Sequence, residues 1–241
     1  MINTAALLAN SDADRGLVGR VMRAVTDHIR IGRLRRGDTI PSEATLATEL
    51  DVSRTVVREA YRSLSTLGII DVGNGRRARV GSIDNNVLGM VFDHAVQTDQ
   101  ASIQQIYDVR RTIEMRTVAL AALRRSDREA HEIGRFAAAM LEDFHTPDRV
   151  MEHDIAFHAA IGRASRNPLF ALIVSSFEVV TRQTWRIGWT SRPSDADRLN
   201  SVDCHIRIAA AITAGDQHLA EATMAEHFDK SVKALLAAGI V

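Results

Sequence analysis

Residues 37–60 read GDTIPSEATLATELDVSRTVVREA. The dipeptide Pro41-Ser42 predicts the start of a short helix, because serine is a preferred N-cap. The apolar face of that helix is Leu46, Ala47 and Leu50. Asp51-Val52 predicts a tight turn, after which Ser53 caps a second helix with the apolar positions Val57, Ala60, Leu64 and Leu67. Two short helices joined by a tight turn are typical of a helix-turn-helix motif.

The segments on either side complete a winged helix-turn-helix. Apolar residues recur with helical spacing over residues 17–34, and the turn at Gly37-Asp38 ends that first helix. After Gly68, which ends the third helix, residues 69–72 and 78–80 predict two short strands around the hairpin turn Gly73-Asn74-Gly75. Three helices and a two-stranded wing therefore predict a DNA-binding domain over residues 12–81.

The composition describes an ordinary soluble chain. Its 241 residues are 46% hydrophobic and 25% charged, which excludes wholesale disorder. The single cysteine, Cys204, excludes an internal disulfide and any multi-cysteine zinc site. No apolar run approaches the ~20 residues that cross a bilayer, and the N-terminus lacks the pattern of a secretory signal. We therefore expect a cytoplasmic protein.

The net charge is zero, with 30 Lys+Arg against 30 Asp+Glu, but the charges are unevenly placed. Residues 1–80 hold thirteen arginines and nine acids, so the first third carries an excess of four positive charges and the remainder the same excess of negative charges. This asymmetry indicates two parts with different tasks, and a positive first third suits binding to DNA.

The candidate DNA-contacting residues lie at the start of the second motif helix and on the wing. The N-terminal turn of that helix enters the major groove in helix-turn-helix proteins. Arginines four residues apart share one helical face, and each can contact guanine or a phosphate. The candidates are Ser53, Arg54, Thr55 and Arg58 on the helix, and Gly75 and Arg76 on the wing. The alternative for the arginines is a solvated helix face.

The rest of the chain predicts helices alone. Breaks fall near residues 98–99, 126–127, 146–147, 167–168, 192–193 and 215–216, which leaves six or seven helices in an antiparallel bundle. We expect residues 82–98 to form a linker and connecting helix, and residues 99–238 to form an effector- and metal-binding domain. The predicted fold class is therefore mainly α.

Four residues of the bundle have the spacing of metal ligands. Asp154 and His158 lie four residues apart on one helical face. His205 and His227 flank the predicted turn at Gly215 at similar distances, so an antiparallel helix pair brings them to the same height. One carboxylate and three imidazoles suit Zn, Ni, Mn or Fe, and an octahedral ion would keep two open positions. The alternative is a set of hydrogen-bonded core histidines.

An open metal site also suits a metal-dependent hydrolase, because a bound ion can activate water. No Glu, Ser or Cys stands at a spacing that implies a base or a nucleophile. The basic winged helix would also have no role in such an enzyme. We therefore expect a protein that is not an enzyme, with a metal-sensing regulator as a further alternative.

The first motif resembles the GntR family of bacterial transcription regulators. The matching residues are Gly37 to Glu43, Leu46-Ala47, Val52 to Ala60, Leu64 and Gly68. The resemblance implies that Arg54, Thr55, Arg58 and Gly75 contact operator DNA. Many members have arginine where this chain has Ala44, so the operator pattern is expected to differ here.

The second half is similar to the FCD domain of the FadR-type branch of this family. The matching residues are Tyr107 to Glu114, Asp154, His158, Asn167, His205, Ala209 to Ile212, Gly215-Asp216, Ala222 and His227. In metal-binding members, the residues matching Asp154, His158, His205 and His227 hold the ion, and a carboxylate effector completes its coordination. The resemblance also implies that Arg110 pairs with the effector carboxylate, the alternative being an ion pair with Glu114. Arg182 and Trp185 are further candidates for the effector pocket, unless they serve solvation and core packing.

The sequence thus predicts a sequence-specific DNA-binding transcription regulator. We expect a repressor that binds a pseudo-palindromic operator as a homodimer, because two-fold protein symmetry matches two half-sites. The expected effector is a small organic or sugar acid.

Overall fold

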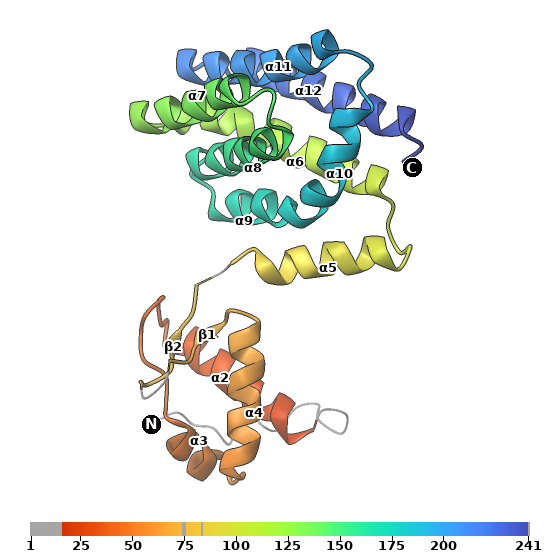
Figure 1. The fold of residues 1–241 in the computed structure, drawn as a ribbon. Coiled ribbons are helices and arrows are strands. Elements are labelled where there is room, and N and C mark those ends of the chain that lie inside the picture. Colours follow the sequence, from red (N-terminus) through yellow and green to blue (C-terminus); the bar gives the residue numbers. More distant parts are fainter. Residues whose placement is uncertain (1–15, 74–75, 83, 241) are drawn as a thin grey trace. The chain divides into compact units, whose positions relative to one another are not determined.

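The computed structural model describes residues 16–73, 76–82 and 84–240 (Figure 1). The chain divides into two compact units, residues 1–87 and residues 88–241, and each is described here by itself. Helices dominate both units, and the predicted mainly α fold class is confirmed. No helix in the described part of the chain is both long and apolar enough to cross a membrane.

The first unit is a winged helix-turn-helix. Its helices are α2 (Leu17–Ile31), α3 (Glu43–Leu50) and α4 (Arg54–Thr66). Strands β1 (Ile70–Asp71) and β2 (Arg79–Val80) pair antiparallel, with Ile70 opposite Val80. A single bridge from Thr39 to Arg79 adds the segment before α3 to this small sheet.

Local side-chain chemistry sets the bounds of α3 and α4. The hydroxyl of Ser42 accepts the N–H of Thr45 at 3.1 Å, and the hydroxyl of Ser53 accepts the N–H of Val56 at 3.3 Å. Both are N-cap bonds that satisfy helix-end donors. Between the helices, Asp51 adopts a left-handed conformation with φ 53°, which closes the turn in few residues. The apolar faces of the three helices meet in one core that is centred on α4.

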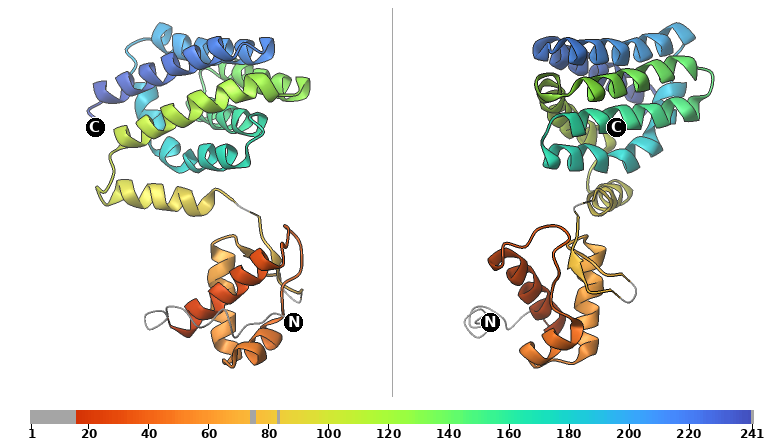
Figure 2. Two further views of the ribbon diagram at one scale, coloured as in Figure 1. Left: turned by 180° about the vertical axis from the view of Figure 1, so that it is seen from behind. Right: turned by 90° about the vertical axis from the view of Figure 1, so that its left-hand side faces the viewer.

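The second unit is a bundle of antiparallel helices (Figure 2). Its elements are α5 (Asn86–Gln97), α6 (Ile103–Arg124), α7 (Asp127–Glu142), α8 (Pro147–Ala164), α9 (Pro168–Ser176), α10 (Glu178–Thr190), α11 (Asp195–Ala214) and α12 (Gln217–Ala237). The unit boundary falls two residues inside α5. The helices α6, α7, α8, α11 and α12 surround the main core. There α7 packs against α8 and α11, α6 against α8, α11 and α12, and α10 against α8 and α12.

One helix break was not predicted. The helices α9 and α10 are separated at Phe177, which keeps right-handed helical angles (φ −74°, ψ −9°). Its N–H bonds to the carbonyl of Val174, three residues back, so the last turn of α9 is tightened. Neither glycine nor proline stands there, and the pattern of apolar residues continues through the break.

The helix α5 packs on the second unit. Phe92 stacks on Phe177 with ring centroids 5.2 Å apart, and Val96 joins the same small cluster. Gly89 lets α5 approach closely, since a Cβ there would lie 3.1 Å from a methyl group of Val179. The segment that we expected to connect the domains is therefore attached to α10 and the break before it.

Candidate functional site

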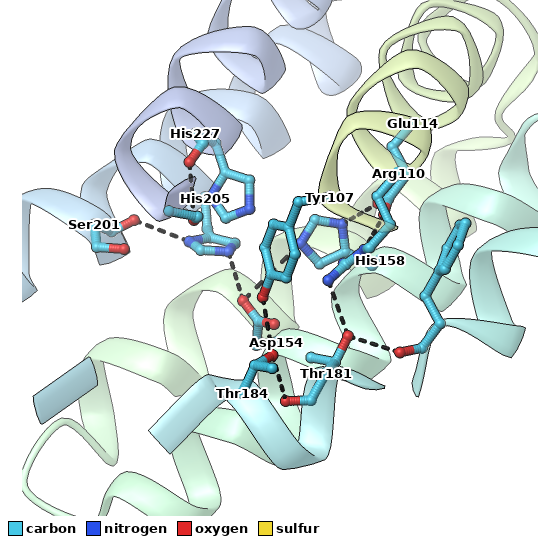
Figure 3. A network of polar contacts seen from close by, with 12 residues as sticks. Tyr107, Arg110, Glu114, Asp154, His158, Thr181, Thr184, Ser201, His205 and His227 are labelled. Atoms are coloured by element: carbon cyan, nitrogen blue, oxygen red, sulfur yellow. Dashed lines mark hydrogen bonds and ion pairs between the residues drawn. The ribbon is translucent and has the colours of Figure 1, made fainter. Parts of the chain in front are cut away.

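The four predicted metal ligands lie together inside the bundle (Figure 3). Asp154 and His158 come from α8, His205 from α11 and His227 from α12. All four side chains are buried, and the ligand nitrogens of the three histidines lie within 4.8 Å of one another. The imidazole centroids of His205 and His227 are 4.5 Å apart, those of His158 and His227 5.2 Å.

The helix pair α11–α12 places two of these imidazoles as the sequence predicted. Gly215 ends α11 in the left-handed region with φ 74°, which glycine adopts without steric cost. Asp216 then caps α12 by accepting the N–H of Leu219 at 2.9 Å. The tight reversal keeps His205 and His227 on facing surfaces at the same height.

Glu114 on α6 orients His158. Its carboxylate forms a very short hydrogen bond with Nδ1 of His158 and also accepts from Nε of Arg110 at 3.0 Å. A carboxylate accepts, so Nδ1 of His158 carries the proton and Nε2 faces the other histidines. That Nε2 is buried and has no hydrogen-bond partner among the described residues. A carboxylate behind an imidazole is a common arrangement in metal sites.

His205 is oriented by the backbone. Its Nδ1 lies 2.9 Å from the carbonyl oxygen of Ser201, which can only accept a hydrogen bond, so Nδ1 is the donor. Its Nε2 lies 2.8 Å from Oδ1 of Asp154. The same oxygen is 3.9 Å from Nε2 of His158. A lone pair on Nε2 of His205 would repel the carboxylate of Asp154 at 2.8 Å, so this pair of atoms requires a proton or a metal ion between them.

The charges of this cluster are strongly coupled. Burial alone would raise the pKa of Asp154 and of Glu114, but both are held below their usual values by their histidine partners and, for Glu114, by Arg110. Burial alone would lower the pKa of His158, but Glu114 and Asp154 raise it. Burial together with the neighbouring His205 and His158 lowers the pKa of His227 far below its usual value, which favours the neutral form that binds metals.

The donor set fits a divalent transition metal. Two ligands at right angles on one ion with bonds of about 2.1 Å lie about 3 Å apart. The observed 2.8 Å between Asp154 and His205 matches that separation. The unpartnered Nε2 of His158 and the ring of His227 face the same point, so the cluster offers three imidazole nitrogens and one carboxylate.

A cavity lies beside this cluster, and polar groups converge on it. Asp154, His205 and His227 line it on one side, and the stacked rings of Trp185 and Trp189, with centroids 5.0 Å apart, form an apolar wall. Further lining groups are Tyr107, Arg110, Thr181, Thr184, Arg192, Ser201 and Ser231. Two of the predicted effector-binding residues, Arg110 and Trp185, therefore face this cavity. Arg110 also makes the ion pair with Glu114, so both arrangements considered for it occur together.

Arg182, the third predicted effector-binding residue, does not line this cavity. Its guanidinium pairs with Glu152 and Glu178, and its side chain is 39% exposed. The residues of α10 that line the cavity are Thr181, Thr184, Trp185, Gly188 and Trp189.

The predicted DNA-contacting side chains are exposed in the first unit. Ser53, Arg54, Thr55 and Arg58 occupy the cap and first turns of α4 and are exposed, as is Arg76 on the wing. The Nε of Arg58 lies 3.3 Å from a carboxylate oxygen of Glu43. Gly75, the remaining predicted contact, lies outside the described residues.

Several residues of the site were not predicted from the sequence, among them Glu114, Ser201 and Arg192. Glu114 was considered only as a partner of Arg110, whereas it also holds His158, 44 residues away. Ser201 orients His205 through its carbonyl oxygen, one helical turn earlier, and no side-chain pattern signals that bond. Arg192 stands in the break between α10 and α11, where a charged residue is normally solvated, yet it lines the cavity.

Comparison with known families matches both units. Residues 17–80 match the family model described as bacterial regulatory proteins, gntR family, and residues 105–230 match the FCD domain. A solved structure of Streptococcus agalactiae GntR aligns with a TM-score of 0.61 at 23% identity, over 88% of this chain and 97% of that one. That structural likeness supports the fold.

Curated relatives cover most of the chain. The HTH-type transcriptional regulator LutR of Bacillus subtilis is 30% identical over 203 residues, which are 83% of this chain and 92% of the relative. The transcriptional repressor NanR of Enterobacter sp. is 26% identical over 90% of this chain and 84% of its own length. The Glc operon transcriptional activator of Escherichia coli is 29% identical over 68% of this chain and 67% of its own length.

The two ion pairs at the centre of α6 predict contrasting stability effects. Glu114→Ala leaves Arg110 buried without its partner and should lower the free energy of unfolding by about 3–5 kcal/mol. Asp229→Ala removes the partner of the exposed neighbour Arg111 and should cost about 0–1 kcal/mol. Urea unfolding followed by tryptophan fluorescence measures both, because Trp185 and Trp189 are the only tryptophans and lie in this unit. Equal losses in the two variants would contradict the assigned roles.

Proposed function

The chain belongs to the GntR family of bacterial regulatory proteins and carries an FCD domain, and we propose that a carboxylate effector, held at a metal ion in this domain, controls its binding to operator DNA. The observation that carries the effector site is the buried Nε2 of His158. It has no partner in the described structure and faces His205, His227 and Asp154 beside a cavity that is lined by arginines.

We propose that Asp154, His158, His205 and His227 hold the ion, which is Zn, Ni, Mn or Fe. When bound, the ion supplies a positive charge and open coordination positions for an anionic oxygen. Glu114 and the carbonyl of Ser201 keep the two Nε2 atoms turned toward the ion's position. Arg110, which donates to Thr181 at 2.9 Å, is positioned to bind an effector carboxylate at the cavity.

The DNA-reading part of the proposal rests on α4 and the wing. Arg54 and Arg58 share the exposed face of α4, and Ser53 and Thr55 present hydroxyls to phosphates. We propose that Arg76, with Gly75 beside it in the sequence, contacts the backbone or the minor groove. The protein would act as a homodimer on a pseudo-palindromic operator.

Binding of DNA should depend on the first turns of α4. The double variant Arg54→Ala/Arg58→Ala removes two bidentate donors, and its specific affinity should fall at least about 30-fold, since each base contact contributes about 1–3 kcal/mol. A band-shift titration on a duplex that the wild-type chain selects from a random library measures this. Arg30→Ala is the control, because Arg30 is exposed and pairs with Asp27 away from α4. Wild-type affinity in the double variant would refute the assigned recognition helix.

Metal binding should depend on the histidine pair of the α11–α12 hairpin. The wild-type chain, loaded with zinc and dialysed, should retain about one ion per chain, and His205→Ala/His227→Ala should retain little, because half of the donor set is gone. Elemental analysis measures the ratio. His153→Ala is the matched control on α8, since His153 bonds to Asp143 and lies outside the cluster. Full occupancy in the double variant would refute the ligand set.

We propose repression, relieved by the effector. Among the named relatives, NanR is a repressor and the Glc operon protein an activator, so the family alone does not fix the sign. In a purified transcription assay, the metal-loaded chain should reduce transcript from its operator, and an organic or sugar acid identified by thermal shift should restore it. The chelated chain should lose this response. Relief by the metal alone would instead indicate a metal sensor, and a rise in transcript on adding the chain would indicate an activator.

A further inference from the structure

Arg192 brings a second guanidinium to the cavity. It lies just after the end of α10, in the break before α11, and lines the same cavity as His205 and His227. One of its terminal nitrogens donates to the carbonyl of Gly188 and the other to the hydroxyl of Ser201 at 3.2 Å. Both acceptors are neutral, so neither compensates its charge.

No carboxylate in the described part of the chain lies within ion-pair distance of Arg192. The other arginine of the cavity, Arg110, is matched by Glu114 at 3.0 Å. Asp154 and Asp197 act on Arg192 only from beyond contact, and Asp154 is already engaged with His205. Arg192 is half-buried, and this burial lowers the pKa of its guanidinium. A charged group in such surroundings is stabilised by an anion that enters the cavity.

The charges around the cavity call for a dianion. With a divalent ion in place, the positive charges are the ion and the two arginines, Arg110 and Arg192. The negative charges are Asp154 and, behind Arg110, Glu114. The divalent ion counts two positive charges and each arginine one, whereas Asp154 and Glu114 count one negative charge each. With neutral histidines, two positive charges therefore remain uncompensated. One carboxylate at the ion would satisfy half of this excess and leave Arg192 unmatched.

The position of Arg192 is fixed before any ligand arrives. Arg198 on α11 donates to the carbonyl oxygens of Trp189 at 3.2 Å and of Arg192 at 3.1 Å, which ties the end of α10 to α11. Arg192 and Ser201 also line a neighbouring hollow that contains Lys230 and Lys233. Arg192 therefore lines both the inner cavity and a hollow that carries two lysines and the carboxylate of Asp197.

We infer that Arg192 binds a second acid group of the effector, so that the effector is a diacid with one carboxylate at the metal and Arg110 and the other at Arg192. This inference rests on the proposed carboxylate site and adds the class of acid that the site prefers. The hydroxyls of Tyr107, Thr184 and Ser231 also line the cavity and suit hydroxyl or carbonyl oxygens on the diacid.

The test compares diacids with monoacids of the same chain length. Isothermal titration of the zinc-loaded chain, with its zinc content measured before and after, uses malate against 2-hydroxybutyrate, succinate against butyrate and glutarate against valerate. At least one diacid should bind about tenfold or more tightly than its partner, as expected for a charge-assisted hydrogen-bonded pair. Arg192→Gln should reduce that preference to about threefold or less while leaving the affinity for the monoacid nearly unchanged.

Two further variants complete the design. Arg186→Gln is the matched control, because Arg186 lies on α10, is 69% exposed and does not line the cavity. Arg192→Lys keeps the positive charge and should retain the preference for the diacid, which keeps the inference testable if Arg192→Gln does not fold. An undiminished preference in folded Arg192→Gln, or its loss in Arg192→Lys alone, would overturn the role of Arg192.

The outcomes separate this inference from the proposed function. If monoacids bind to the zinc-loaded chain and no diacid binds better, the carboxylate site stands and the inference about Arg192 fails. If the chain holds no zinc and neither kind of acid binds, the proposed effector site fails, and the inference fails with it.

Discussion

Buried charges that compensate one another govern the architecture of the helical unit. Arg110, Glu114 and His158 form a chain of ion pairs inside an apolar bundle, and Asp154 with His205 forms a second. Burying an ionised group is costly unless it is paired, so the helices that supply these residues must stay in register. The helices α6, α8 and α11 are therefore held together by this network as well as by their apolar faces.

The helix α10 contacts both the cavity and α5. One face of α10 lines the cavity through Thr181, Thr184 and Trp185. The side chain of Gln183, on the same helix, donates to Asp93 of α5 at 2.6 Å, and Phe92 of α5 stacks on the residue before α10. In the order of elements, α5 is the first helix after β2 of the DNA-binding unit. An effector that favours one position of α10 would thus act on α5, the helix that follows the wing in the sequence. This contact is a physical basis for a shift in the populations of the chain's conformations.

Local signals made much of this fold predictable. Ser42, Ser53 and Gly215 act through neighbours in the sequence, so their positions could be read from the chain. The histidine pair followed from helical geometry and one turn. The partnership of Glu114 with His158 joins two helices 44 residues apart, and no periodicity specifies it. Arg192 gave no signal because its surroundings are set by contacts between the end of α10 and α11. The break at Phe177 lacks glycine and proline, so only the backbone reveals it.

We propose that the buried histidine cluster is a metal centre beside an effector cavity. X-ray diffraction from crystals of the zinc-loaded chain, recorded on both sides of the zinc absorption edge, tests it directly. We predict one anomalous peak per chain, within about 2.0–2.2 Å of Nε2 of His158 and of His205, a ring nitrogen of His227 and a carboxylate oxygen of Asp154. A peak elsewhere, or none with zinc in the crystal, would contradict it and leave the cluster as a hydrogen-bonded core.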